Sequence, residues 1–127
     1  MKILQGNRIP KPLGHSSTAI ISNHQLYISG QYPISLEGTM YVEDDFETQF
    51  NIVFQNIENI LQSNLINLQK IVKVTVYLSD IKYYPQFNAL FADFIGKHKP
   101  VRTVVPVAEL QFGSKLAVDI IAETPQR

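Results

Sequence analysis

The sequence contains no cysteine, which removes several kinds of chemistry from consideration. Without thiols, the 127-residue chain cannot form disulfides, build thiolate metal sites or use a cysteine nucleophile. An excess of either charge is also missing, because 11 Lys and Arg residues balance 11 Asp and Glu residues. A chain without net charge has no long-range field to draw it to nucleic acid or to an anionic membrane, so we expect neither partner.

Long apolar runs are absent as well. No segment approaches the roughly 18 consecutive apolar residues that span a bilayer, and residues 1–8 lack the apolar core of a signal peptide. We therefore expect a cytoplasmic protein. With 45% hydrophobic residues, the chain is long enough to bury one core. It has no internal repeat or linker, so residues 1–127 are expected to form a single domain.

The usual cofactor and metal motifs are missing too. No glycine-rich phosphate loop is present, which argues against a nucleotide cofactor. His15, His24 and His98 lack metal-ligand spacing, and we expect no metal and no cofactor. Ser29 has neither a nucleophile-elbow context nor an evident base. Its hydroxyl is expected to hydrogen-bond a ligand or the backbone.

Hydrophobic periodicity predicts the element order β-β-α-β-α-β-β. Asp44 and Glu47 form a capping-box pattern ahead of an apolar stripe at helical spacing. Asp80 is expected to cap a second helix, which Gly96 and Pro100 bring to an end. Strands are expected at residues 18–21, 25–29, 71–78, 101–108 and 116–123, with a further one near residues 2–5.

The last predicted strand is apolar on both sides. Side chains alternate between the two faces of a strand, so Leu116, Val118 and Ile120 are expected on one face and Ala117 and Ile121 on the other. Two helices can cover only one face of such a sheet, and soluble monomers rarely expose a large apolar patch. We therefore expect a homo-oligomer in which neighbouring subunits bury the second face.

Two opposite charges interrupt the apolar strands. Arg102 lies in the segment 100–107, and Asp119 lies in the segment 116–122. A guanidinium cannot be deprotonated, so its burial requires an anion or several acceptors. The two residues predict either a structural ion pair or a small site for a carboxylate. Asn88, in the second helix, is expected to hold a neighbouring loop, and Tyr32 could form a wall of a pocket.

Several segments together resemble the RidA/YjgF family of enamine/imine deaminases over nearly the whole chain. No single segment is specific, but six in the right order and at the right spacing are a strong signal. The matching segments are Leu13–Gly14, Ile28–Pro33, Val74–Asp80, Phe87–Ala89, Pro100–Thr103 and Val107–Leu110.

The resemblance implies a chorismate-mutase-like α+β fold with two helices on one face of a mixed sheet, assembled as a homotrimer with pockets between subunits. It also implies cofactor-free hydrolysis of 2-aminoacrylate and 2-iminobutyrate to 2-keto acids and ammonia. Arg102 matches the carboxylate-binding arginine of the family, Ser29 its pocket serine and Asn88 its loop asparagine. Backbone groups near Gly30 and Val104 are expected to supply further hydrogen bonds to the substrate.

This sequence departs from the family pattern at three positions. Asp119 stands where the family has a water-orienting glutamate, Ser16 where it usually has a tyrosine, and Val104 where it often has a cysteine. The shorter carboxylate favours an alternative function, a non-catalytic regulatory protein that binds a metabolite in the same pocket. The altered loop at His15 and Ser16 favours another, a deaminase for a different carboxylate such as aminomuconate. Neutral net charge argues against RNA cleavage.

Overall fold

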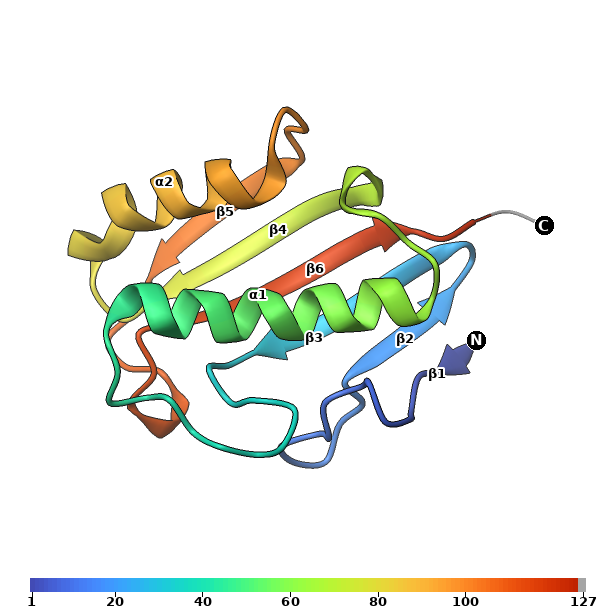
Figure 1. Ribbon diagram of the computed structural model, residues 1–127, viewed down its shortest axis with the longest axis horizontal. Coiled ribbons are helices and arrows are strands. Elements are labelled where there is room, and N and C mark those ends of the chain that lie inside the picture. The colour runs from blue at the N-terminus through green and yellow to red at the C-terminus, as the bar shows by residue number, and fades with distance from the viewer. Residues whose placement is uncertain (126–127) are drawn as a thin grey trace.

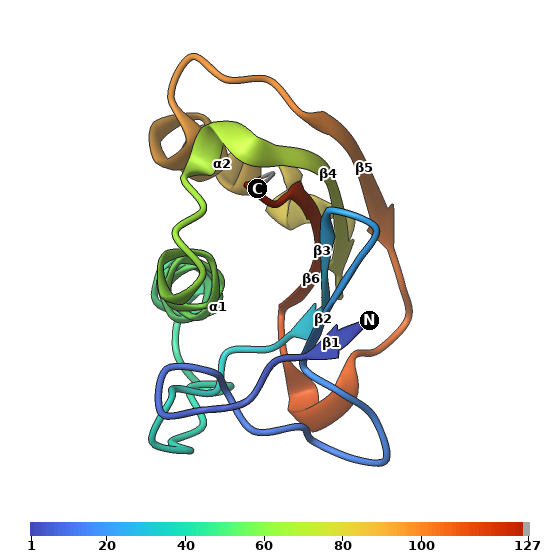
Figure 2. The same cartoon turned by 90° about the vertical axis from the view of Figure 1, so that its right-hand side faces the viewer.

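Two helices pack against one face of a six-stranded sheet in the computed structural model, which describes residues 1–125 (Figures 1 and 2). The strand order is β1-β2-β3-β6-β4-β5, and all neighbours are antiparallel except β4 and β5. Helix α2 makes the crossover between these two parallel strands. The main elements are β1 (Lys2–Ile3), β2 (Ala19–Ser22), β3 (Gln25–Gln31), α1 (Phe46–Ser63), β4 (Ile71–Leu78), α2 (Tyr84–Ile95), β5 (Val101–Pro106) and β6 (Leu116–Glu123).

The observed elements confirm the predicted order, including the additional strand near residues 2–5. Strand β4 has the predicted bounds, 71–78, and β6 has the predicted bounds, 116–123. Strand β5 ends at Pro106, two residues before the predicted end. Strand β3 extends two residues beyond the prediction, to Gln31, across a register shift.

The N-cap of α1 differs from the prediction by one residue. Asp45, and not Asp44, accepts a hydrogen bond from the backbone N–H of Thr48 at 2.9 Å. Both aspartates can cap a helix. Asp44 instead contributes its main-chain carbonyl, which accepts from Gln49 Nε2 at 2.9 Å. Because Gln49 is fully buried, this contact anchors the preceding loop to the helix.

Helix α2 also begins differently from the prediction. Asp80 accepts a hydrogen bond from the backbone N–H of Lys82 and caps the short 3-10 helix η2 (Ile81–Tyr83), not α2 itself. Helix α2 follows directly, with Pro85 in its first turn, where a missing N–H costs nothing. Gly96 ends α2 as predicted, in a conformation with φ of 73° that favours glycine.

The core lies between the helices and the sheet. Four phenylalanines connect the two helices: the ring centroids of Phe50 and Phe87 lie 5.7 Å apart, and those of Phe54 and Phe91 lie 5.9 Å apart. Their burial confirms the apolar stripes predicted for both helices. This packing fixes α2 above β4 and β5, the position on which the candidate site depends.

The opposite face of the sheet is not covered by any described element of the chain (Figure 2). Apolar side chains remain exposed on it, with 49% of Ile3, 41% of Tyr27 and 63% of Val101 accessible to solvent. One row across this face, from β1 to β5, consists of Ile3, Ile20, Tyr27, Ile121, Lys73 and Val101.

This open face predicts self-association. We expect light scattering coupled to size exclusion to give about three chain masses, because other subunits would bury the exposed apolar row. A charge placed in the row, such as Tyr27→Asp, should shift the protein toward monomer. The same change at Leu65, which is exposed just beyond the end of α1, is the control, and Leu65→Asp should leave the mass unchanged. A parent protein that runs as a monomer at all concentrations would contradict this prediction.

Candidate functional site

Arg102 lies on the edge strand β5 and its guanidinium packs against α2. Its Nη2 donates to Asn88 Oδ1 at 2.9 Å and to the Tyr84 hydroxyl at 3.2 Å. The guanidinium carbon also lies 5.6 Å and 5.4 Å from the ring centroids of Phe87 and Phe91. Aromatic rings attract a cation within about 6 Å. The side chain is thus held in place by neutral groups, and its Nε and Nη1 hydrogens remain available to an anion.

Asp119 lies on the other face of the sheet. Arg102 pairs with Val74, which pairs with Ile120, and both of these apolar partners are buried beneath the helices. Asp119 precedes Ile120 in β6 and pairs with Thr75. Because neighbouring side chains of a strand point to opposite faces, Asp119 points to the open face of the sheet. Arg102 and Asp119 cannot meet within one chain, so the interpretation as an intramolecular ion pair is wrong.

The carboxylate of Asp119 sits beside a bend in β3. Its Oδ1 lies 3.5 Å from the position that a Cβ on Gly30 would occupy, which is an ordinary van der Waals distance and places the carboxylate directly beside Gly30. Partial burial raises the pKa of Asp119 above its usual value. Burial also raises the pKa of the Tyr32 hydroxyl, and the nearby Asp119 charge raises it further. These residues form a small, partly desolvated acidic cluster.

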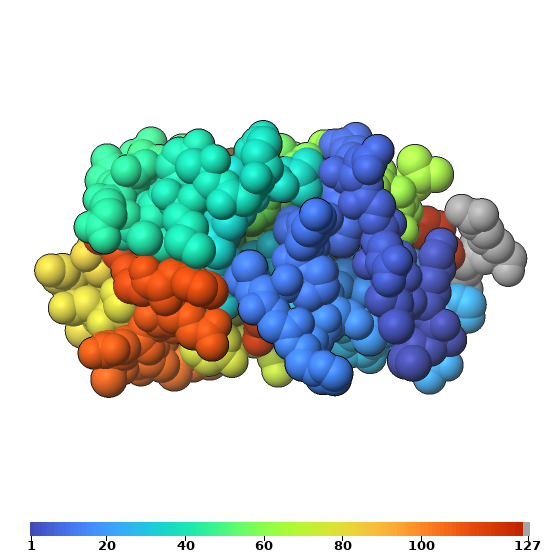
Figure 3. All heavy atoms as spheres, turned by 90° about the horizontal axis from the view of Figure 1, so that it is seen from below, coloured from blue at the N-terminus to red at the C-terminus, as the bar shows by residue number. Residues whose placement is uncertain are grey.

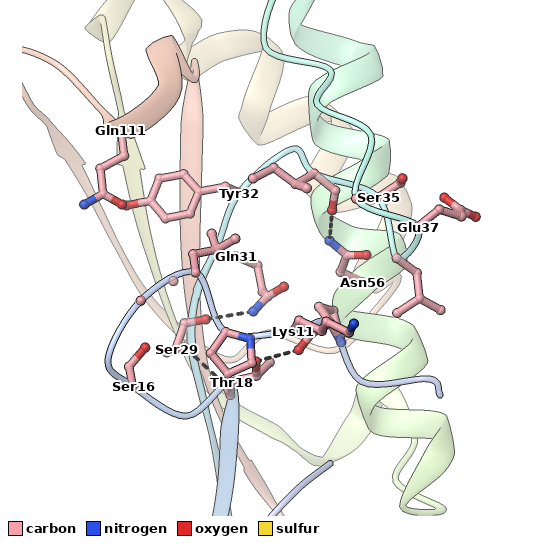
Figure 4. A pocket seen from close by; sticks show the side chains of 18 residues that line it. Lys11, Ser16, Thr18, Ser29, Gln31, Tyr32, Ser35, Glu37, Asn56 and Gln111 are labelled. Carbon is pink, nitrogen blue, oxygen red and sulfur yellow. Dashed lines mark hydrogen bonds between the residues drawn. The ribbon is translucent and has the colours of Figure 1, made fainter. Parts of the chain in front are cut away.

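A cavity of about 460 Å³ lies beside this cluster (Figure 4). Its walls are the first loop, the end of β3 with the loop that follows, and one face of α1. Figure 3 shows the first loop, the β3 loop and the segment around residue 111 close together on one surface of the molecule. Four predicted substrate-binding residues line it: Ser16, Ser29, Gly30 and Tyr32.

Ser29 is placed to accept a hydrogen bond from a ligand. Its hydroxyl donates to the main-chain carbonyls of Ser17 and Thr18, at 3.2 Å and 3.1 Å. A hydroxyl has one hydrogen and two lone pairs, so its acceptor capacity is still available. Tyr32 packs edge-on against Phe112, with ring centroids 5.6 Å apart, and forms a wall of the cavity as predicted.

The predicted site residues fall into two groups on one chain. The first group lies beside the cavity and consists of Ser16, Ser29, Gly30, Tyr32 and Asp119. The second lies against α2 and consists of Arg102 and Asn88, with Val104 two residues along β5 on the same face. Asn88 was expected to hold a loop, but its oxygen holds Arg102 instead.

Three residues near these groups were not predicted from the sequence. Tyr84 contacts Arg102, and its place in the helical stripe beside Asn88 was the available signal. Gln31 and Asn56 line the cavity, although they lie in different elements 25 residues apart. Within residues 1–125, no three His, Asp or Glu side chains are placed to hold a metal ion. No helix in that range is long and apolar enough to cross a membrane.

Comparison with known proteins identifies the family. A family model described as "Endoribonuclease L-PSP" matches residues 6–124, and the chain therefore belongs to this family, which is also the YjgF/RidA family. A RutC family protein of Pyrococcus horikoshii is 35% identical over 113 residues, which is 89% of this chain and 90% of the relative.

Solved structures agree with this assignment. The Rid family protein YyfA from Yersinia pestis is 34% identical, with a TM-score of 0.89 that covers 97% of this chain and 98% of its own. E. coli TdcF, solved with bound serine, is 25% identical with a TM-score of 0.89 and covers 98% of this chain and 100% of its own. The family and the α+β fold are thus established.

The raised pKa of Asp119 predicts how stability depends on pH. A carboxyl with a raised pKa in the folded state binds protons more tightly when folded than when unfolded, so it stabilises the fold at low pH. This stability is lost as the pH rises from the ordinary Asp pKa of 3.8 through the folded value. Asp119→Asn should therefore be more stable than the parent near pH 7, with the difference shrinking toward pH 4.

Denaturant unfolding at fixed protein concentration across this pH range checks the prediction. Asp93→Asn, on the exposed side of α2, is the control and should show no such trend. If Asp119→Asn is less stable than the parent at neutral pH, a cationic partner stabilises the carboxylate in solution, and burial within one chain does not set its pKa.

Proposed function

We propose that this protein is a deaminase that hydrolyses small 2-imino acids, and the 2-amino-enoic acids that tautomerise to them. In the reaction, R–C(=NH)–COO⁻ and water give R–C(=O)–COO⁻ and ammonia. One observation carries the proposal: Arg102 is oriented by Asn88 and Tyr84, two neutral partners that leave its charge uncompensated. A carboxylate is the partner that such a guanidinium binds best. The serine bound to TdcF, itself an α-amino carboxylate, supports the same ligand class.

We propose that the complete site forms between subunits of a homotrimer. Arg102 and Asp119 point away from each other in one chain, so a site that uses both needs a second copy. In this arrangement, the β5 edge of one subunit lies against the open sheet face of the next. Arg102 then approaches the neighbour's Asp119 and Ser29 across the apolar row.

Asp119 would move the protons. It would pass one proton from the attacking water to the imine nitrogen as the C–O bond forms and the C=N double bond becomes single, which gives a carbinolamine. It would then pass the hydroxyl proton of the carbinolamine to the amine nitrogen as the C=O bond forms, the C–N bond breaks and ammonia leaves. A pKa raised by burial brings the carboxyl closer to the operating pH, where one group can act as both base and acid. Ser29 would accept a hydrogen bond from the imine nitrogen, and Arg102 would hold the carboxylate throughout. No step requires a cofactor.

A regulatory protein that binds a metabolite is the alternative. The shorter side chain of Asp119 favours it, because an aspartate ends roughly 1.5 Å short of a glutamate and a misplacement of about 1 Å can lower the rate about 100-fold. The same pocket would then bind a 2-keto acid without turnover. RNA cleavage, suggested by the family description, has less support because the chain carries 11 basic and 11 acidic residues.

Replacement of Arg102 tests the proposal. Arg102→Lys keeps the charge but loses the planar set of donors, so we expect kcat/KM on 2-iminobutyrate to fall about 100-fold. The measurement is keto-acid and ammonia release from imine generated enzymatically in situ. Arg8→Lys is the matched control and should leave the rate unchanged, because Arg8 is exposed and, among the described residues, donates hydrogen bonds to Asn59 and Gln62 on the surface of α1.

Two outcomes would contradict the assignment. If Arg102→Ala is as active as the parent, Arg102 does not bind the substrate carboxylate. If the parent releases no ammonia but binds 2-ketobutyrate, and Arg102→Ala abolishes this binding, the protein is the regulatory alternative.

A further inference from the structure

We infer that the cavity inside each chain is a side-chain subsite, and that it selects ligands whose side chain ends in a carboxamide. The inference deepens the proposed function, on which it rests for the reaction. It concerns the group R of the 2-imino acid, which Arg102 and Asp119 do not contact in the proposed site. The observations that carry it are two amide oxygens in the cavity wall.

Both oxygens belong to buried glutamine and asparagine side chains. Gln31 is 6% exposed and Asn56 is 3% exposed. The Gln31 amide nitrogen donates to the Ser29 carbonyl at 3.3 Å, and the Asn56 nitrogen donates to the Ile34 carbonyl at 2.8 Å. These contacts fix the orientation of both amides, so each oxygen is directed away from the backbone that its nitrogen holds.

Neither oxygen accepts a hydrogen bond from a described residue. Within residues 1–125, however, no fully buried side-chain oxygen or nitrogen lacks a partner. The small exposed area of Gln31 and Asn56 therefore includes these oxygens, and both residues line the cavity. Figure 4 shows the Gln31 side chain extending across the cavity toward Asn56. The interior thus presents two fixed acceptor oxygens that receive no hydrogen bond from the described residues.

The cavity adjoins the proposed reaction centre. Ser29 and Gly30 form part of its wall, and Asp119 Oδ1 lies within 3.5 Å of the space beside Gly30. Ser16 is one of the first-loop residues that line the cavity, and its side chain is small. At about 460 Å³, the cavity is within the ~300–1,000 Å³ range of small-molecule sites. A methyl or ethyl group would leave most of this volume unfilled.

The chemistry of the wall defines the ligand. An apolar side chain would displace water from the two oxygens and leave them unpaired, which is strongly unfavourable for buried acceptors. An ammonium would lose its hydration without gaining a buried counter-charge, because the only acidic side chain of the cavity, Glu37, is exposed at its rim. A carboxamide supplies two neutral N–H donors, which match the two oxygens.

Calorimetric titration with two isosteric amino acids tests the inference in the parent protein. L-asparagine and L-leucine have side chains of nearly the same shape, but only asparagine carries the carboxamide. We expect asparagine to bind at least about tenfold more tightly, because a site built to hydrogen-bond a ligand rejects an analogue that lacks the donor. Equal affinities, tighter leucine binding, or binding of neither amino acid would overturn the inference.

Substitutions of Gln31 and Asn56 test whether their side-chain amides cause the preference for asparagine over leucine. Gln31→Met and Asn56→Leu should each reduce asparagine affinity while leaving leucine affinity equal or higher. Gln55→Met is the matched control, because Gln55 neighbours Asn56 on α1 but is exposed and should leave both affinities unchanged. Thermal unfolding identifies any variant that fails to fold. In that case the ratio of asparagine affinity to leucine affinity in the parent protein tests the inference alone.

The test separates this inference from the proposed function. If the parent deaminates 2-iminobutyrate but does not prefer asparagine to leucine, the deaminase stands and the carboxamide subsite is wrong. If it prefers asparagine but releases ammonia from no imine, the subsite stands and the proposed function is wrong.

Discussion

The alternation of side chains along a strand is the constraint on which the candidate site depends. Residues paired across neighbouring strands share a face, and the registers of β4, β5 and β6 send Arg102 and Asp119 to opposite faces. No rotamer change can bring the two together through a sheet. The two residues therefore belong to separate groups on one chain, and the proposed function, which uses both, requires a second subunit.

The surrounding fold orients the residues of each group and sets their electrostatic environment. On the helix side, packing between the helices fixes α2 above β5, so that Asn88 and Tyr84 hold the guanidinium of Arg102. On the open side, Asp119 lies beside Gly30 of β3, and partial burial raises the pKa of its carboxyl. An oriented cation and a desolvated carboxylate are thus presented at different surfaces of one molecule.

Hydrophobic periodicity was sufficient to predict the element order and the bounds of β4 and β6, because continuous β-branched runs define those strands clearly. Adjacent Asp44 and Asp45 could not be told apart, since both residues suit a cap and only the loop geometry selects between them. Strand register is not readable from one sequence, so the opposite directions of Arg102 and Asp119 were not predicted. The cavity was missed for a similar reason, because Gln31 and Asn56 come together only through tertiary packing.

If catalysis requires Arg102 of one subunit and Asp119 of another, two inactive variants should restore activity when they assemble together. Arg102→Ala and Asp119→Asn should each be inactive alone. After the two are mixed, unfolded and refolded together, about a quarter of the clefts in a ring of head-to-tail contacts combine both intact residues. We therefore expect the mixture to recover about a quarter of the parent activity per chain. If the mixed protein forms trimers but remains as inactive as its components, the site does not lie between subunits.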